Sequence, residues 1–247
     1  MKDIIKLNCD MGESFGIYKM GFDEQIIPFV DMANLACGFH SGDADTMNSS
    51  VALAKQYDKM IGAHPSYQDL VGFGRRTMHC SSSEITSKVL YQIGALSAFC
   101  QVHTTKISYV KPHGALYNDM MKDEKIFRAI LEALSSFDKT LKLMILSTPN
   151  NSTFENIAFE YDIKLIYEVF ADRNYNDDGS LVSRSDTNAV IHDVELVKER
   201  ISTLQKDGYF TSINGEKLYI QADTLCVHGD NENALEFIKL LRNLLKR

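Results

Sequence analysis

Short apolar runs alternate with longer amphipathic stretches along the whole chain. The runs are rich in β-branched residues and predict seven buried strands. These strands cover residues 4–7, 32–37, 59–63, 107–110, 141–146, 164–170 and 224–227. Regular alternation of strand and helix is typical of a parallel sheet with right-handed crossovers.

The amphipathic stretches predict the helices that connect these strands. They cover residues 23–30, 46–57, 81–103, 124–137, 153–161, 188–206 and 231–245. Asp43 or Asp45 can cap the second of them, and Ser81 with Glu84 has the spacing of a capping box. Residues 115–118 are predicted to continue a loop. Residues 209–213 and 217–221 flank Asn214-Gly215, which predicts a small β-hairpin outside the strand–helix alternation.

Polar and titratable residues follow six of the seven predicted strands. They are Asp10 and Glu13, His40, His64, Lys111 and His113, Asp172 and Arg173, and His228 and Asp230. A closed barrel gathers all strand ends at one mouth, whereas an open sheet binds ligands at one switch point. The pattern therefore favours a seven-stranded parallel β/α barrel, similar to a TIM barrel. No long linker or low-complexity segment interrupts it, so a single domain over residues 1–247 is expected.

Composition and charge narrow the classes of partner. The 247 residues carry a formal net charge of -7, which gives nucleic-acid binding no support. We expect no membrane partner and a cytoplasmic location, because the sequence shows neither a signal peptide nor a long apolar stretch. The five cysteines include no CxxC pair, which argues against a structural zinc site of that type. Cys9, Cys37 and Cys226 lie beside the polar motifs, as catalytic thiols or as small buried residues.

The residue types at the strand ends suit two kinds of chemistry. His40, His64, His113 and His228 stand at equivalent places, and four such histidines are hard to explain as ordinary loop or core groups. Histidines with carboxylates at one mouth serve general acid–base catalysis, or they bind a divalent metal that activates water. The sequence has no HExxH motif, so the metal hypothesis rests on convergence alone. Asp230 has an equal alternative as the cap of the last helix.

Residues 61–76, IGAHPSYQDLVGFGRR, add a polar loop with two adjacent arginines. Arg75 and Arg76 predict binding of a carboxylate or phosphate, although one of the two is expected in a salt bridge at the barrel edge. Lys111 is a candidate for phosphate binding or a Schiff base, with a structural lysine as the alternative. Arg173 joins these candidates for substrate or phosphate binding. The sequence has no GxxxxGK[ST] loop, so no P-loop holds a nucleotide.

Six motifs in order resemble the LamB/YcsF family. They are NCDMGESFG, NLACGFHSGDAD, GAHPSYQDLVGFGRR, VKPHGALYN, EVFADRNYNDDGSLVSR and CVHGD, and together they reach from Asn8 to Asp230. The departures are small: Met11, Ser14, Ser41 and Ser66 stand where other small or apolar residues are expected. None of them is one of the titratable site residues.

The resemblance implies a seven-stranded barrel similar to those of glycoside hydrolases and polysaccharide deacetylases. It also implies ATP-dependent hydrolysis of the lactam of 5-oxo-L-proline to L-glutamate, together with separate B and C subunits. On this hypothesis Arg75 or Arg76 binds the substrate carboxylate or a phosphate, and His64, His113, His228 and Asp10 move protons or position water. Glu13, Asp172 or Asp230 would hold the Mg²⁺ of Mg-ATP. Two alternatives stay open: a metal-dependent amidase or deacetylase that needs no ATP, and a substrate-binding subunit that is inert alone.

Overall fold

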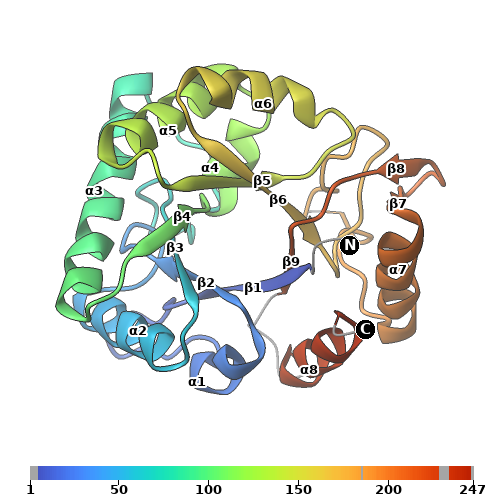
Figure 1. The fold of residues 1–247 in the computed structure, drawn as a ribbon, viewed down its shortest axis with the longest axis horizontal. Helices are drawn as coiled ribbons and strands as arrows, with labels where there is room; N and C mark the ends of the chain where they lie inside the picture. Colours follow the sequence, from blue (N-terminus) through green and yellow to red (C-terminus); the bar gives the residue numbers. More distant parts are fainter. Residues whose placement is uncertain (1–4, 185, 228–233, 246–247) are drawn as a thin grey trace.

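Seven parallel strands close into a barrel with helices around it (Figure 1). The computed structural model describes residues 5–184, 186–227 and 234–245. Neighbouring strands pair in the order β1, β2, β3, β4, β5, β6 and β9, and β9 pairs with β1 to close the ring. The strands are β1 (Lys6–Met11), β2 (Met32–Ala36), β3 (Met60–His64), β4 (Ile107–Val110), β5 (Lys142–Leu146), β6 (Lys164–Phe170) and β9 (Thr224–Val227). The predicted seven-stranded barrel is confirmed.

The helices begin where the sequence supplies capping side chains. Asp43 accepts from the backbone N–H of Thr46, and Ser81 with Glu84 forms the predicted capping box. The helices are α1 (Asp23–Ile26) with the 3-10 turn η1 (Ile27–Phe29), α2 (Ala44–Gln56), α3 (Ser82–Val102), α4 (Gly114–Met120), α5 (Glu124–Phe137), α6 (Asn151–Glu160), α7 (Val194–Asp207) and α8 (Ala234–Leu245). Among the described residues, no helix combines the length and apolarity needed to cross a membrane.

Three local predictions are wrong, and each error has a physical reason. β1 continues to Met11 because Asp10 and Met11 pair with β2, so Asp10 stands inside the strand and not after it. Residues 114–120 form helix α4 instead of a loop, since the apolar residues Ala115, Leu116 and Met120 are buried on one of its sides. α7 begins at Val194 and not at residue 188, because the side chain of Asp193 caps it there.

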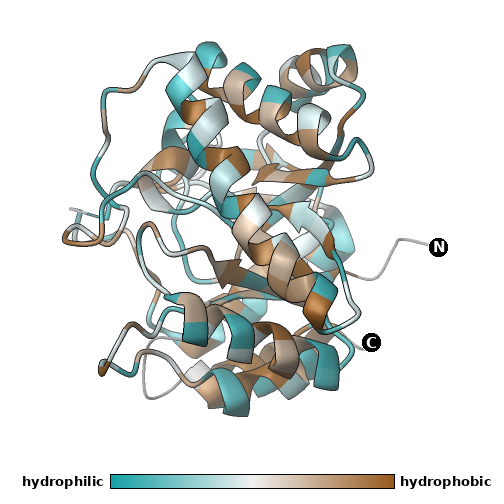
Figure 2. Ribbon diagram, turned by 90° about the vertical axis from the view of Figure 1, so that its left-hand side faces the viewer, coloured by the Kyte–Doolittle hydropathy of each residue, from teal (hydrophilic) through white to brown (hydrophobic). Residues whose placement is uncertain are grey.

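The barrel interior has an apolar layer and a polar layer. Met32, Tyr109, Met144 and Ile166 form an apolar cluster of their own, separate from the larger core between strands and helices. Gly62 makes room for the ring of Tyr109, because a methyl group at position 62 would lie 2.2 Å from two ring carbons. Figure 2 shows hydrophobic residues along the strands and a mixture of hydrophobic and hydrophilic residues on the surrounding helices.

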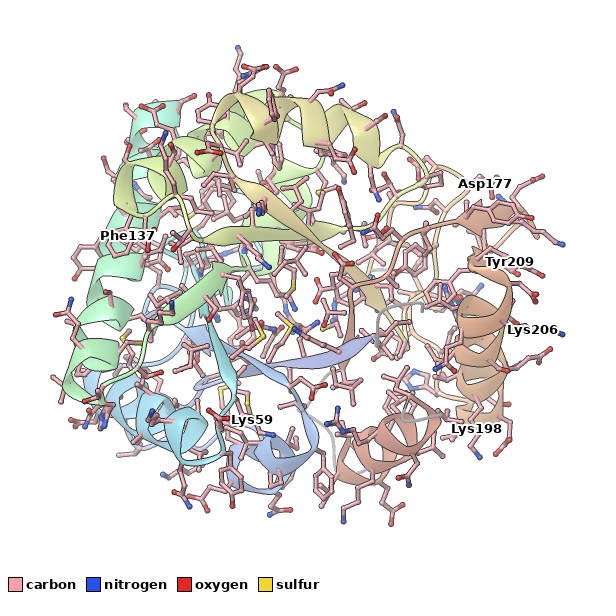
Figure 3. All side chains as sticks on the ribbon, in the orientation of Figure 1. Lys59, Phe137, Asp177, Lys198, Lys206 and Tyr209 are labelled. Carbon is pink, nitrogen blue, oxygen red and sulfur yellow. The ribbon has the colours of Figure 1, made fainter. Side chains whose placement is uncertain are left out.

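The predicted hairpin is present, with shorter strands than expected. β7 (Tyr209–Thr211) pairs antiparallel with β8 (Lys217–Tyr219) around Asn214-Gly215. Ser212 and Asn214 donate side-chain hydrogen bonds to Asp177, at 2.5 and 3.0 Å. Figure 3 shows Asp177 and Tyr209 on the side of the molecule that carries β8 and α7. The hairpin therefore holds the loop that follows β6 in place through these two hydrogen bonds.

Candidate active site

Six of the sequence-predicted site residues meet at the carboxyl ends of β1 to β4. They are Asp10, Glu13, His40, His64, Lys111 and His113. Asp10 lies near the end of β1, His64 is the last residue of β3, and Lys111 follows β4 directly. Glu13 and His40 come from the loops after β1 and β2. The barrel thus brings together side chains that are up to 103 positions apart in the sequence, from Asp10 to His113.

Three buried imidazoles form the centre of the site. The rings of His40 and His113 stack in parallel, with centroids 3.8 Å apart, and His64 meets both rings edge-on. Gly74 permits this stack, because a methyl group there would lie 2.7 Å from Cβ of His40 and 2.8 Å from Cδ2 of His113. The ring of Phe73 closes the stack edge-on, at 5.5 Å from His40 and 5.3 Å from His113.

Burial keeps two of these imidazoles neutral. It lowers the pKa of His40 and of His113 well below the ordinary value, and the positive charge that neighbouring histidines would carry lowers both further. The guanidinium of Arg75 adds to the lowering at His40. Neutral imidazole has one lone pair that can take a proton or bind a metal. His40 and His113 are therefore acceptors or ligands at neutral pH, and not fixed positive charges.

A buried charged network lies beneath the histidines. Nζ of Lys111 is 2.9 Å from Oδ1 of Asp10 and 2.8 Å from Oε1 of Glu168. Burial opposes the charge on Lys111, but these carboxylates outweigh it and raise its pKa well above the ordinary value. Burial by itself would raise the pKa of Asp10. The effects of His64 and Lys111 outweigh that of burial and hold the pKa of Asp10 well below the ordinary value. Lys111 is thus a paired ammonium, without the neutral form that a Schiff base requires.

Sequence reasoning missed the polar residues that line the barrel below Asp10. Asn34 donates to Oδ1 of Asp10 at 2.7 Å and accepts from the hydroxyl of Tyr109 at 2.6 Å. Tyr117 donates to Oε2 of Glu168 at 2.7 Å. Glu168 stands within the otherwise mostly apolar strand KLIYEVF, and this isolated charge is the signal that could have found it. The remaining members are Asn8, Thr224 and Cys226.

The two adjacent arginines have different surroundings. Arg76 pairs with the buried carboxylate of Asp69, and its hydrogen bonds lower the pKa of that carboxyl to about 2. Arg76 is therefore the predicted salt bridge of the pair. The guanidinium of Arg75 lies 5.1 Å above the centre of the Phe73 ring, next to the stacked histidines. Arg75 is the arginine of the pair that lies beside the histidine cluster.

Of the four candidates from the last strands, two make hydrogen bonds within the loop that follows β6, and two lie outside the described residues. Arg173 is buried and donates to the carbonyl oxygens of Ala189 and Val182, so it holds the loop after β6. Asp172 is half-buried beside it, and its backbone oxygen accepts from Ile191. His228 and Asp230 follow β9 and lie outside the described residues.

The cysteines near the site have the character of buried residues. Cys9, Cys37 and Cys226 are all buried and free. Burial raises the pKa of Cys37 to about 12 and raises those of Cys9 and Cys226 well above the ordinary value. A nucleophilic cysteine needs a thiolate near neutral pH, so these thiols fit the alternative of small buried residues.

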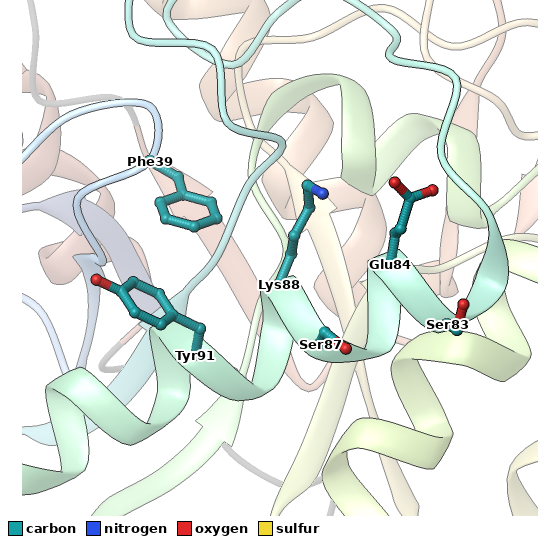
Figure 4. Close-up of a pocket in the computed structure, with 6 residues that line it drawn as sticks. All are labelled: Phe39, Ser83, Glu84, Ser87, Lys88 and Tyr91. Atoms are coloured by element: carbon teal, nitrogen blue, oxygen red, sulfur yellow. The ribbon is translucent and has the colours of Figure 1, made fainter.

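A surface pocket lies outside the mouth. It has a volume of about 340 Å³ and lies along α3, lined by Phe39, Ser83, Glu84, Ser87, Lys88 and Tyr91 (Figure 4). The rings of Phe39 and Tyr91 stack with centroids 5.4 Å apart. None of the six lining residues belongs to the histidine cluster or to the Lys111 network, although Phe39 directly precedes His40.

Fold and site together define a class: closed parallel β/α-barrel proteins with a buried histidine–carboxylate centre at the carboxyl ends of the strands. Within that class, this chain belongs to the LamB/YcsF family, whose model matches residues 5–247.

Relatives of known name resemble the chain over almost its full length. It is 51% identical over 246 residues to a protein of Vibrio vulnificus (strain YJ016) named as the A subunit of 5-oxoprolinase, covering 100% of this chain and 99% of that protein. It is 48% identical over 242 residues to the protein of the same name from Pyrococcus abyssi (strain GE5 / Orsay), covering 98% of this chain and 94% of that protein. The crystal structure of the "Lactam Utilization Protein" from Thermus thermophilus has a TM-score of 0.90 and 40% identity, covering 98% and 96% of the two chains.

Proposed function

We propose that this chain is the A subunit of a cytoplasmic, ATP-dependent 5-oxoprolinase. It would hydrolyse the lactam of 5-oxo-L-proline to L-glutamate, with ATP converted to ADP and phosphate, in a complex with B and C subunits. The observation that carries the proposal is the end-to-end similarity to proteins named as the A subunit of 5-oxoprolinase, at 51% identity. The "Lactam Utilization Protein" with the same fold points to the same class of substrate.

The chemistry explains why such a reaction needs ATP. A five-membered lactam is unstrained and stabilised by resonance, so the ring is favoured over the open amino acid. Transfer of the γ-phosphoryl group to the lactam oxygen turns the ring carbon into a good electrophile. Water then adds to that carbon, the carbon–nitrogen bond breaks and the nitrogen takes a proton, which leaves the γ-acyl phosphate of glutamate. A second water hydrolyses this acyl phosphate and releases phosphate. Each turnover thus consumes one ATP and two waters.

The residues at the mouth fit the proton transfers in this sequence. Asp10 has Oδ1 held by Lys111 and Asn34, while Oδ2 lies 3.4 Å from Nε2 of His64. In the proposal, Asp10 takes the proton from the attacking water and returns it to the leaving nitrogen. Arg75 binds the substrate carboxylate at the rim through its planar guanidinium.

The test is a paired measurement of glutamate and phosphate released from 5-oxoproline and ATP, with and without the B and C subunits. We expect turnover only in the full mixture, with one phosphate for each glutamate. Asp10→Asn should lower kcat at least about 100-fold, in the range that general acid–base groups contribute. Glu132→Gln, on the exposed side of α5, is the control and should leave kcat unchanged.

Other outcomes would replace the proposal. Glutamate release without ATP would identify an ATP-independent amide hydrolase. Tight binding of 5-oxoproline without turnover in any mixture would identify a substrate-binding subunit.

A further inference from the structure

The outer nitrogens of two histidines are fixed by backbone carbonyl groups. Nδ1 of His64 lies 2.6 Å from the carbonyl oxygen of Lys111, and Nε2 of His113 lies 2.9 Å from that of Phe73. A carbonyl oxygen can only accept, so each of these ring nitrogens carries the proton and donates it. The inner nitrogens, Nε2 of His64 and Nδ1 of His113, therefore carry lone pairs in the neutral rings.

Those two inner nitrogens lie only 2.9 Å apart. Two lone pairs at this distance repel each other and form no hydrogen bond. The contact becomes favourable only when one positive charge is placed between the nitrogens, either a proton or a metal ion. A proton would serve only these two nitrogens, whereas a metal ion would also use the further donor atoms that lie around them.

A carboxylate completes the group. Oε1 of Glu13 lies 3.8 Å from Nδ1 of His113, and the donor atoms of Glu13, His40, His64 and His113 all lie within 4.8 Å of one another. Donor atoms around a tetrahedral zinc ion with bonds of about 2.1 Å are separated by about 3.4 Å. The observed separations of 2.9 and 3.8 Å lie on either side of this value. Small movements of the side chains are therefore enough for them to surround an ion.

We propose that Glu13, His64 and His113 bind one divalent transition-metal ion of the zinc type at the barrel mouth. Two imidazoles and one carboxylate are a ligand set typical of catalytic zinc, which leaves a fourth position open. The two backbone carbonyls supply the outer hydrogen bonds that orient metal-binding histidines in proteins.

His40 has a different place in this arrangement. Its Nε2 lies 3.2 Å from Oε1 of Glu13, while its buried Nδ1 has no hydrogen-bond partner within the described part of the chain. It lacks the outer carbonyl that holds the other two rings. His40 is therefore a positioning residue, which donates from Nε2 to Glu13 and keeps the carboxylate turned toward the histidine pair.

The experiment is a direct titration of the isolated full-length chain with Zn²⁺. The protein is stripped with a chelator, shown to be folded by circular dichroism, and titrated in a calorimeter. We expect one ion per chain with a dissociation constant below about 1 μM, on the order expected for a three-ligand site. His64→Gln and His113→Gln should each weaken binding at least about 100-fold. His192→Gln removes an exposed histidine outside the cluster and should change nothing.

Co²⁺ gives a second readout, which is spectroscopic and is applied to wild type and variants shown to be folded by circular dichroism. Co²⁺ in the wild-type protein should show the intense visible absorption of a tetrahedral site, and Glu13→Gln should weaken it. Folded wild-type protein that binds no Zn²⁺ at micromolar concentration, or histidine variants that bind it as tightly as the wild type, would overturn the proposal. Neither titration contains ATP, lactam or partner subunits, so failure of the proposed enzymatic activity would leave the metal result untouched.

Discussion

At the scale of single residues, the site consists of charges that depend on one another. Lys111 is buried between Asp10 and Glu168, and each carboxylate also accepts a hydrogen bond from a neutral group, Asn34 or Tyr117. An ammonium buried in this way persists only because its partners are present. The position of the Asp10 carboxylate is therefore set by Lys111 and Asn34, which act on it without having to contact a substrate themselves.

Replacing Lys111 by methionine tests this dependence. The substitution keeps an unbranched side chain, one atom shorter, but leaves the buried carboxylate of Glu168 and the partly buried carboxylate of Asp10 without their cation. We expect the free energy of unfolding to fall by about 3–5 kcal/mol, as when one partner of a buried ion pair is removed. Guanidinium unfolding measures the loss. Adding Glu168→Gln to Lys111→Met should restore part of it, and a double variant no more stable than the single one would contradict the network.

We expect Arg75 and Arg76 to have different functions. Arg75→Ala removes the guanidinium beside the histidine stack and, on the proposed function, should raise KM for 5-oxoproline about tenfold in the full complex. Arg76→Ala removes the partner of the buried Asp69 and should lower the midpoint of thermal unfolding with little change in KM. Steady-state kinetics and thermal unfolding of both variants measure the difference. An equal change of KM in both variants would refute the distinction.

Asp23 gives a pH-dependent prediction. Burial raises the pKa of Asp23 to about 6, although the backbone N–H of Gly12 donates to it at 2.7 Å. Because this pKa lies above that of the unfolded chain, about 3.9, the contribution of Asp23 to stability is full below pH 4 and is lost as the pH rises through 6. Relative to Asp23→Asn, which keeps the acceptor, the wild type should lose up to about 3 kcal/mol of stability by pH 7.

The measurement is urea unfolding of both proteins at pH 5 and pH 7. About half of the difference should develop between these two values, and the other half is already lost on going from pH 3 to pH 5. Glu132→Gln, an exposed carboxyl on α5, serves as the control for removing one negative charge. A difference between wild type and Asp23→Asn that does not change with pH would show that Asp23 does not titrate in this range.

At the scale of elements, the sequence predicted most strands and helices well because capping residues and β-branched runs are local signals. β4, β6, β9 and α5 begin and end where expected. The strand-end candidates could be found because motifs such as KPHG follow a strand directly. Glu168, Asn34 and Tyr109 could not be assigned, since their contacts depend on the register between strands that are distant in sequence. The pairing of Arg76 with Asp69 likewise needed the folded loop.

Two glycines provide a matched test of close packing between elements. Gly62→Ala in β3 places a methyl group 2.2 Å from the Tyr109 ring and should lower stability by about 1–3 kcal/mol. A methyl group at Gly94 in α3 would meet no described atom within 4 Å, so Gly94→Ala should raise stability by about 0.5–1 kcal/mol. Chemical unfolding of both variants measures the two changes in the free energy of unfolding, which should have opposite signs. A stable Gly62→Ala protein would mean that the Tyr109 ring can move without cost.

At the scale of the whole molecule, the ring of strands joins the two ends of the chain. β9 lies between β6 and β1, so the last strand closes the barrel beside the first. Asn8 donates to Thr224 at 2.9 Å across a separation of 216 residues. The interior polar layer therefore includes both the earliest and the latest strands, although the histidine cluster itself comes from the first half of the chain.

This closure has a consequence for synthesis on the ribosome. The segment that carries Asp10 and the three histidines leaves the ribosome long before residues 224–227 are made. Until then one edge of β1 has no neighbouring strand, and the charged residues that will line the barrel are not yet enclosed. A nascent chain in this state is exposed to misassembly and depends on late, long-range pairing that is intrinsically slow. The synthesis and pairing of β9 thus decide whether the earlier residues become a site.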